Sequence, residues 1–204
     1  MCNSVKPLLP AEYQQVDYLQ SSGAQYIKTG INSGIPTNFY VKYEATAINS
    51  NNYIFGTWDS VGRYFVSYNS SGLQWLGYRD SAYSGGTMAL NSVCELTGTL
   101  KPGTQNLYKD GVLQSSGTNS GAITAQMEIV VFAVNYGPLG KPPIQAYTSG
   151  KMYRFTLYNN LATILDYIPC YRKSDNKPGM YDLVTNTFFT NAGTGADFSV
   201  GNNV

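Results

Sequence analysis

Both tryptophans of this 204-residue chain stand in one stretch, residues 58 to 80, among charged and phenolic side chains. Aromatic rings stack against the apolar C–H faces of sugars, while nearby carboxylates, amides and guanidinium groups hydrogen-bond the sugar hydroxyls. The stretch therefore predicts a carbohydrate-binding site. The residues expected to form it are Trp58, Asp59, Arg63, Tyr64, Trp75, Tyr78, Arg79 and Asp80.

Several of these residues also have a purely structural explanation. Trp58 follows Gly56 at an expected strand end, which favours a loop position and an exposed ring. Trp75 falls inside a strand pattern, where packing in the core is the more common role. Arg63 and Arg79 fit charges at the edge of a strand. The patterns thus favour Trp58 over Trp75 as an exposed ring.

The chain offers little for hydrolytic chemistry. It has no histidine, which excludes Ser-His-Asp and Cys-His nucleophilic arrangements and every zinc site that needs His. Glycoside hydrolysis needs two carboxylates across a groove, and no expected strand carries acids at alternate positions. We therefore predict a protein that is not an enzyme and needs no cofactor. The glutamates are far apart in sequence, at Glu12, Glu44, Glu95 and Glu128.

Oxygen donors for a calcium ion are present but scattered. Asp59, Asn69 and Asp80 are the candidate ligands, since Ca²⁺ prefers carboxylate and amide oxygens. Their spacing matches no known calcium loop, so turn formation is the favoured interpretation. Bound Ca²⁺ stays open as the alternative.

The cysteines predict no covalent framework. They are odd in number and widely spaced, with no CxxC pair, so neither a disulfide nor a zinc site is indicated. Cys94 and Cys170 lie in strand-like runs and are expected to be small buried thiols. The third cysteine is Cys2.

Charge argues against two classes of partner. The net charge is +1 with 12% charged residues, so we expect neither nucleic acid nor an anionic membrane as a partner. No apolar run is long enough for a membrane span or a signal peptide, which predicts no membrane insertion. The basic loop from residue 171 to 177 is interpreted as a solvated connection rather than a binding patch.

Short strand patterns with Gly- and Asn-marked turns run along the whole chain. Their spacing of roughly ten residues is typical of sandwiches and barrels, and helix signals are nearly absent. In residues 151–158, Tyr153, Phe155 and Leu157 are expected on one buried face. The strand over 162–168 is expected to stop at Pro169. We expect loops or connections at residues 81–87, 114–122 and 136–147.

The economical fold for such a chain is all-β, a two-sheet antiparallel sandwich with little or no helix, and a closed barrel is the structural alternative. No composition shift marks a second domain. We therefore expect a leader or linker over residues 1–10 and a single domain over 11–204.

Segments at the two ends carry a recognisable pattern. Residues 9–19, LPAEYQQVDYL, with 22–27, SGAQYI, resemble the opening of concanavalin A-like, laminin-G-like jelly-roll domains of bacteriophage structural proteins and gut-bacterial surface proteins. Residues 166–170, DYIPC, with 172–175 and 179–183, resemble their ending, and the YKDG hairpin at 108–111 is similar to one of theirs. The resemblance implies a jelly-roll sandwich whose terminal segments pair with each other.

That resemblance favours a non-catalytic carbohydrate-binding or adhesion module. It implies a place on the exterior of a phage virion, in attachment to host-surface glycans or as a decoration, with the bacterial cell surface as the alternative. The expected partners are a host cell-surface polysaccharide and other virion proteins, with a homo-oligomer as a further option. A purely structural virion protein is the competing class, and a glycoside hydrolase is the least favoured one.

Overall fold

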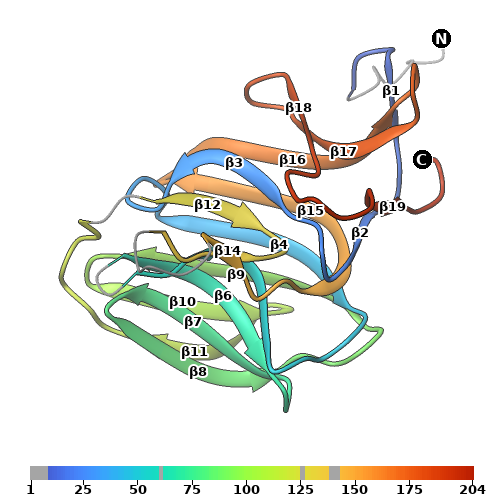
Figure 1. Cartoon of the computed structure of the whole chain (residues 1–204). Helices are drawn as coiled ribbons and strands as arrows, with labels where there is room; N and C mark the ends of the chain where they lie inside the picture. Colours follow the sequence, from blue (N-terminus) through green and yellow to red (C-terminus); the bar gives the residue numbers. More distant parts are fainter. Residues whose placement is uncertain (1–8, 60–61, 125–126, 138–142) are drawn as a thin grey trace, which may run out of the picture.

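The chain folds into two packed β-sheets. The structure, a computed structural model, describes residues 9–59, 62–124, 127–137 and 143–204. Nineteen strands and no helix are found within these ranges, and Figure 1 shows the strands stacked in layers. All pairs are antiparallel except a short parallel pairing of β13 with β5. The predicted all-β, two-sheet antiparallel jelly-roll sandwich is confirmed.

The larger sheet is built around the long central strands of the chain. Its main path runs β11-β10-β9-β4-β15-β16-β17-β18, and β1, β2 and β19 attach beside it. In chain order its strands are β1 (Tyr13–Gln15), β2 (Leu19–Ser22), β4 (Asn38–Ala45), β9 (Val93–Lys101), β10 (Thr104–Lys109), β11 (Val112–Gly117), β15 (Ser149–Asn159), β16 (Ala162–Arg172), β17 (Lys177–Asp182), β18 (Thr187–Thr190) and β19 (Ser199–Val200).

The smaller sheet contains the stretch with both tryptophans. Its path runs β14-β13-β5-β6-β7-β8, with β12 joining β5 to β3. Its strands are β3 (Ile27–Asn32), β5 (Asn51–Thr57), β6 (Arg63–Asn69), β7 (Leu73–Arg79), β8 (Ser81–Thr87), β12 (Glu128–Val131), β13 (Val134–Asn135) and β14 (Ile144–Gln145).

The main core lies between the two sheets and is rich in aromatic rings. Phe55 of the smaller sheet contacts Phe39 and Phe155 of the larger one, with ring centroids 5.1 and 5.0 Å apart. The hydroxyls of Tyr43 and Tyr68, from opposite sheets, both reach Thr148 Oγ1 at 3.0 and 2.9 Å. Burial of these large rings supplies most of the apolar area that holds the sheets together.

The two terminal segments of the chain pair with each other, as the resemblance implied. β1 pairs with β16, and β19 pairs with β2, which itself pairs with β15. Figure 1 shows β1, β19 and the C-terminus at one end of the molecule. The segments at the two ends of the chain thus close the larger sheet together.

Two expected connections are strands instead. Residues 81–87 form β8, which pairs with β7 from Ser81 to Thr87, and residues 112–117 form β11. Gly and Ser in these segments favoured loops on propensity, but pairing with a neighbouring strand overrides a weak propensity. In the expected loop over 136–147, β14 is a two-residue strand, and residues 138–142 lie outside the described residues.

The two patterns expected near residue 150 also need correction. β15 contains a bulge between Met152 and Arg154, and a bulge shifts the alternation by one residue. Met152 is therefore fully buried, whereas Tyr153 is only half-buried. β16 continues through Pro169, which pairs with Met180 of β17. The Pro169 carbonyl accepts from Val16 N at 3.1 Å, so the side of Pro169 that lacks the N–H faces the place where β16 passes from pairing with β15 to pairing with β1, and no ladder hydrogen bond to β17 is lost.

The basic loop and the thiols have structural roles in the fold. Arg172 pairs with Asp175 within the loop at 2.6 Å, and Lys177 pairs with Asp197 at 2.7 Å. Cys94 and Cys170 are free and buried, as predicted. Residues 1–8, which hold Cys2 and most of the predicted leader, lie outside the described residues. Within the ranges that the structure describes, no helix is long and apolar enough to span a membrane.

Candidate functional site

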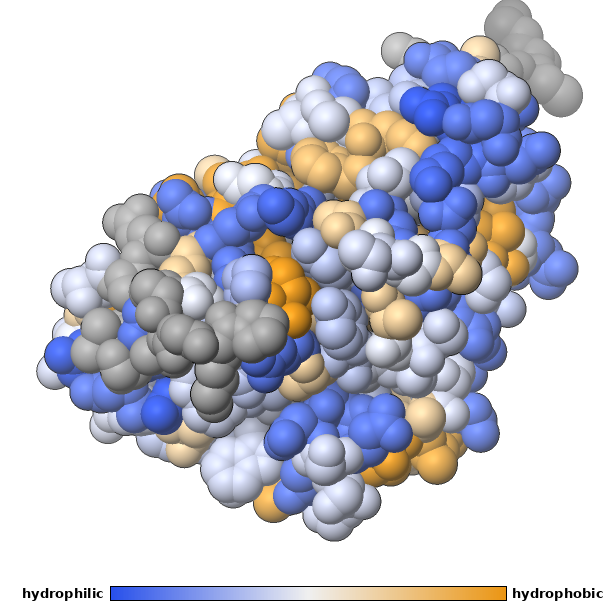
Figure 2. Space-filling model, viewed as in Figure 1, coloured by the Kyte–Doolittle hydropathy of each residue, from blue (hydrophilic) through white to orange (hydrophobic). Residues whose placement is uncertain are grey.

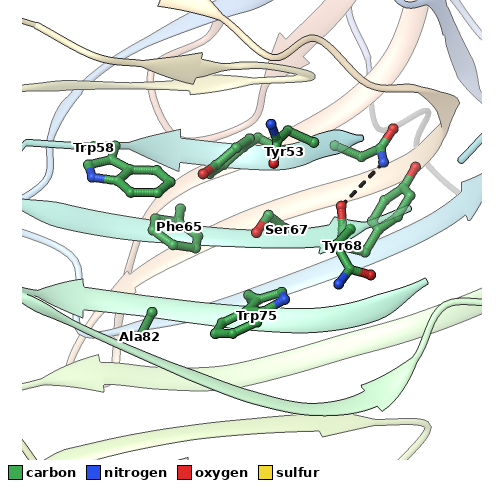
Figure 3. Close-up of a pocket in the computed structure, with 10 residues that line it drawn as sticks. Tyr53, Trp58, Phe65, Ser67, Tyr68, Trp75 and Ala82 are labelled. Carbon is green, nitrogen blue, oxygen red and sulfur yellow. Dashed lines mark hydrogen bonds between the residues drawn. The ribbon is translucent and has the colours of Figure 1, made fainter. Parts of the chain in front are cut away.

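A solvent-open hollow lies on the outer face of the smaller sheet. Its volume is about 210 Å³, and it is lined by the side chains of four adjacent strands, β5 to β8, and the loop after β5 (Figure 3). Apolar surface predominates in it. The described residues that line it are Asn51, Asn52, Tyr53, Trp58, Phe65, Ser67, Tyr68, Asn69, Trp75 and Ala82.

The hollow exists because large and small residues alternate across the strands. Ser67 on β6 stands in register between Tyr53 on β5 and Trp75 on β7. Since directly paired side chains on one face are neighbours, the small Ser67 leaves a depression between two large rings. A serine hydroxyl therefore lies at the floor of an aromatic-walled hollow.

One wall of the hollow is a stack of rings. The Trp58 indole stacks on Phe65 and on Tyr136, with centroids 5.5 and 5.6 Å away and interplanar angles of 21° and 22°. The Arg63 guanidinium lies over the same indole, 5.1 Å from its centroid. Neighbouring groups thus occupy the flat surfaces of Trp58, which makes this ring a fixed wall of the site.

Trp75 differs from Trp58 in its contacts with other rings. Its ring is half-buried, like that of Trp58, and packs against the cluster of Tyr53, Phe65 and Val134, but it belongs to none of the stacked or edge-on ring pairs found among the described residues. Figure 3 shows it lying beside Ser67, apart from the Trp58 and Phe65 rings. Both indoles are half-buried, so neither the exposed Trp58 nor the core-packed Trp75 expected from the sequence is found. Trp75 differs from Trp58 in having no ring stacked on it among the described residues, which makes it the better candidate for contact with a ligand.

Polar groups around the hollow differ in how free they are. The Asn52 amide is fully buried and donates to Asn49 O at 2.8 Å and Tyr68 O at 3.2 Å, so it fixes the strand end. Asn69 Oδ1 accepts from the amides of the β6–β7 turn. Burial chiefly raises the pKa of Tyr53, whose hydroxyl also hydrogen-bonds Tyr136, so Tyr53 stays neutral. The wall is therefore uncharged and hydrogen-bonding.

Two predicted site residues lie inside the protein. Tyr64 is fully buried and Tyr78 is 3% exposed, both in the core between the sheets. Alternate residues of a strand face opposite sides, so these two point inward while Arg63, Phe65 and Trp75 point outward. Tyr64 and Tyr78 are corrected to core residues. Burial raises the pKa of both, that of Tyr78 to about 12.

The charged residues predicted for the site hold a neighbouring turn. Arg79, with a positive φ of 53°, and Asp80 form the tight connection from β7 to β8 and pair with each other at 2.9 Å. Arg63 Nη1 donates to Asp80 O at 2.9 Å. A hydrogen bond from Asn119 is the main reason that the pKa of Asp80 is lowered. These residues border the hollow at its Trp58 end.

The calcium candidates do not converge. Asp59 is 7% exposed, Asp80 sits in the β7–β8 turn, and Asn69 sits in the β6–β7 turn at the other end of β7. Across the described ranges, no group of three or more acidic or cysteine residues is placed to hold a metal ion.

The sequence interpretation missed Tyr53, Phe65 and Ser67, and it named Asn69 only as a candidate calcium ligand. The signal for three of them was available, because a period of two places Phe65, Ser67 and Asn69 on the same face of β6 as Arg63. Tyr53 could be found only from the register of β5 against β6, which the bulge between Tyr53 and Phe55 obscures.

Comparison with known proteins shows the fold of this chain but not its family. No family model and no curated protein matches the sequence, but solved structures match the fold. One is a Bacteroides ovatus protein provisionally named as carbohydrate-binding, with a TM-score of 0.61, 13% identity and 94% of this chain covered. This chain spans 61% of that protein's length.

Two further structures have similar folds. The heptameric SAP-like pentraxin of Limulus polyphemus matches with a TM-score of 0.50 and 14% identity, over 72% of this chain and 75% of the pentraxin chain. The CBM40 module of the Ruminococcus gnavus IT-sialidase matches with a TM-score of 0.49 and 11% identity, over 71% of this chain and 94% of the module. At 13% and 14% identity, the likeness to the Bacteroides ovatus protein and to the pentraxin shows a shared β-sandwich fold and nothing beyond it.

Proposed function

We propose that this chain is a non-catalytic carbohydrate-binding module whose site is the hollow on the outer face of the smaller sheet. The observation that carries the proposal is the half-buried Trp75 ring, on which no other ring is stacked among the described residues, beside the Ser67 hydroxyl and opposite a fixed wall of Trp58 and Phe65. A sugar ring needs an aromatic surface for its C–H face and polar atoms at its rim. Both are present within this hollow.

The character of the lining supports binding without catalysis. None of the described residues that line the hollow is an Asp or a Glu, whereas glycoside hydrolysis uses two carboxylates on either side of the bond. The fold shared with the Bacteroides ovatus protein is compatible with this role, because that protein is provisionally named as carbohydrate-binding.

We propose a setting for the module as well, on the exterior of a phage particle, where it would bind a polysaccharide of the host surface. The terminal segments, which resemble those of phage structural domains, support this setting. A bacterial cell surface is the second candidate, supported by the same resemblance. Whole-cell binding assays with labelled protein, alongside mass spectrometry of purified virions, would distinguish the two.

The binding proposal is tested on a glycan array and by titration with any glycan that it identifies. We expect Trp75→Ala to weaken binding at least tenfold, which corresponds to about 1.4 kcal/mol. The matched control is Leu161→Ala, because Leu161 is 99% exposed at the β15–β16 hairpin of the other sheet. Equal binding by the parent protein and Trp75→Ala would contradict this site.

A purely structural interaction protein is the competing class, and it makes a different prediction. Its outer aromatic face would be covered by a neighbouring subunit in the assembled particle. Hydroxyl-radical footprinting of Trp75 in the isolated chain and in the particle distinguishes them. Protection of Trp75 in the particle, with no glycan bound by the isolated chain, would favour the structural class.

A further inference from the structure

A second polar and aromatic surface lies on the larger sheet, on the side of the sandwich away from the Trp75 hollow. Tyr40 and Tyr158 are shared by two adjoining depressions there, with volumes of about 290 and 360 Å³. Together the depressions cross β10, β9, β4, β15 and β16. Their described lining is Asn38, Phe39, Tyr40, Thr97, Gly98, Thr99, Tyr108, Arg154, Thr156, Tyr158, Thr163 and Asp166.

Strand register arranges these residues in two parallel rows. The first row runs through direct cross-strand partners in the order Tyr108, Thr97, Tyr40, Thr156, Asp166. The second runs Asn106, Thr99, Asn38, Tyr158, Thr163 in the same way. Neighbouring strands are roughly 4.8 Å apart, so Tyr108 and Tyr40 lie roughly 10 Å apart across the sheet. Rings thus recur along a line perpendicular to the strands.

The charges on this surface are already balanced. Arg154 binds Asp166 through two hydrogen bonds, Nε to Oδ1 at 2.9 Å and Nη2 to Oδ2 at 2.6 Å, and Thr156 donates to Asp166 Oδ1 at 3.1 Å. A bidentate pair of this kind holds both side chains in place. Lys42 pairs with Glu95 at 3.7 Å beside the first row. An acidic or basic polymer would find no excess of opposite charge here.

Tyr40 is the best fixed ring of the surface. It is half-buried, and burial together with a hydrogen bond and the charge of Glu95 raises the pKa of Tyr40 to about 12. A ring held by a hydrogen bond loses little conformational entropy when a ligand stacks on it. Tyr158 flanks it on β15, in register with Asn38.

The side chains of these rows favour a glycan over a protein partner. Protein interfaces have an apolar core with a polar rim, but none of the exposed large aliphatic side chains among the described residues lines either depression. The surface offers instead tyrosine rings with threonine hydroxyls and asparagine amides between them. Rings and hydroxyl-binding groups that alternate along a line suit a chain of linked sugars.

We propose that this face of the larger sheet is a second binding surface that accepts an extended, uncharged polysaccharide, with its chain lying across the strands. The surface is independent of the Trp75 hollow, because it belongs to the other sheet and shares no residue with it. A polymer long enough to span several strands would contact Tyr108, Tyr40 and Tyr158 together.

Affinity electrophoresis of the full chain tests the proposal, with soluble xyloglucan, mixed-linkage β-glucan, galactomannan and dextran as neutral polymers and polygalacturonate and hyaluronan as acidic ones. We expect at least one neutral polymer to retard the parent protein, with both acidic polymers inactive. Tyr40→Ala and Tyr158→Ala should each weaken binding about tenfold, and Tyr158→Phe, which keeps the ring, should bind within about twofold of the parent.

The same assay separates this surface from the Trp75 hollow. If Trp75→Ala still binds the long polymer while the two tyrosine variants do not, the second surface is supported whatever the fate of the first. If no neutral polymer retards the parent, or if only Trp75→Ala loses binding, the proposal is overturned. Thermal unfolding of each variant shows whether lost binding reflects lost folding. If Tyr40→Ala and Tyr158→Ala do not fold, Tyr108→Ala and Tyr158→Phe decide: weaker binding by Tyr108→Ala, with binding kept by Tyr158→Phe, supports the surface, and parent-like binding by Tyr108→Ala overturns it.

Discussion

The Phe65 ring lies directly over Gly77 on the neighbouring strand. A Cβ built on Gly77 would stand 2.1 Å from Phe65 Cε1, far inside van der Waals contact. On its other side, a Cβ on Gly56 would meet the Phe65 Cβ at 2.4 Å. The two glycines let Phe65 lie across the sheet, and in that position Phe65 stacks on Trp58. The ring wall of the hollow therefore depends on residues that have no side chains.

Substituting Gly77 with alanine should disturb this wall. The added methyl would force Phe65 to tilt, and overpacking of this kind costs about 1–3 kcal/mol. Because Trp58 stacks on Phe65, glycan binding in the hollow should weaken as well. Urea unfolding gives the first effect and glycan titration the second. The control is Gly195→Ala, whose Cβ would lie 3.2 Å from Ala24 Cβ; an equal loss in both variants would contradict the argument.

The two tryptophans should separate stability from binding. Trp58 is half-buried but stacks on both Phe65 and Tyr136, so Trp58→Ala should destabilise the fold by about 3 kcal/mol, the low end of the range for loss of a large ring. Trp75 has fewer ring contacts, so Trp75→Ala should cost about 1 kcal/mol but lower the affinity for glycan more than tenfold. Chemical unfolding and calorimetric titration of both variants measure the pair of effects. The reverse ranking for stability would show that Trp75 is the packed ring.

Fluorescence can report on Trp75 alone. Since the chain has two tryptophans, Trp58→Phe leaves Trp75 as the single indole and keeps a ring in the stack. Glycan bound on Trp75 should change the emission intensity or wavelength of this variant in a saturable way. Trp75→Phe, which keeps Trp58, should show little change under the same titration. A larger response from Trp75→Phe would place the ligand at the other ring.

The sequence predicted the fold and only part of the candidate site. Strand spacing and the terminal motifs were sufficient for the sandwich, because alternation and turns are local signals. Tyr64 and Tyr78 were misplaced because the face of a strand that points inward depends on the other sheet. The alternation within β6 and β7 shows which residues share a face, but the packing of Phe55 and Phe155 between the sheets decides which face is buried.

The different ring contacts of Trp58 and Trp75 could not be predicted from local pattern. Trp58 is covered by Tyr136, which is far from it in sequence and reaches it through β13, hydrogen-bonded at Trp58 N to Asn135 O. Trp75 has no ring stacked on it because its register partners are Ser67 and Ser84, both small. The stacking of Tyr136 on Trp58 and the small neighbours of Trp75 both depend on strand pairing, including the parallel pairing of β13 with β5.

Acid should destabilise the larger sheet through Glu44. Burial raises the pKa of Glu44, but hydrogen bonds from Lys151 and Tyr153, at 2.8 Å each, and the charge of Lys151 outweigh it, so the pKa lies below the ordinary value of 4.5. A lowered folded-state pKa gives stability that is present above the unfolded value and is lost as the pH falls through the folded one. Stability should therefore fall below about pH 4.5.

Urea unfolding of the parent and of Glu44→Gln between pH 7 and pH 3 checks this prediction. Glu44→Gln should be less stable than the parent at pH 7 and should lose less stability on acidification. Glu12→Gln is the matched control, since Glu12 is exposed and belongs to none of the ion pairs among the described residues. Parallel pH profiles for the parent and Glu44→Gln would contradict a role for the Lys151–Glu44 pair.

The buried thiols should be unreactive in the folded protein. Burial raises the pKa of Cys94 to about 11 and that of Cys170 to about 12, and charge from neighbouring groups modifies the first value. The thiolate is the reactive form, so at pH 8 both residues should resist a disulfide-exchange reagent for chromogenic thiol titration. In Cys2→Ser we expect no rapid reaction in buffer and two reactive thiols in guanidinium chloride. Fast labelling of Cys170 in buffer would instead show that β1 opens from β16, because Cys170 pairs with Gln15 of β1.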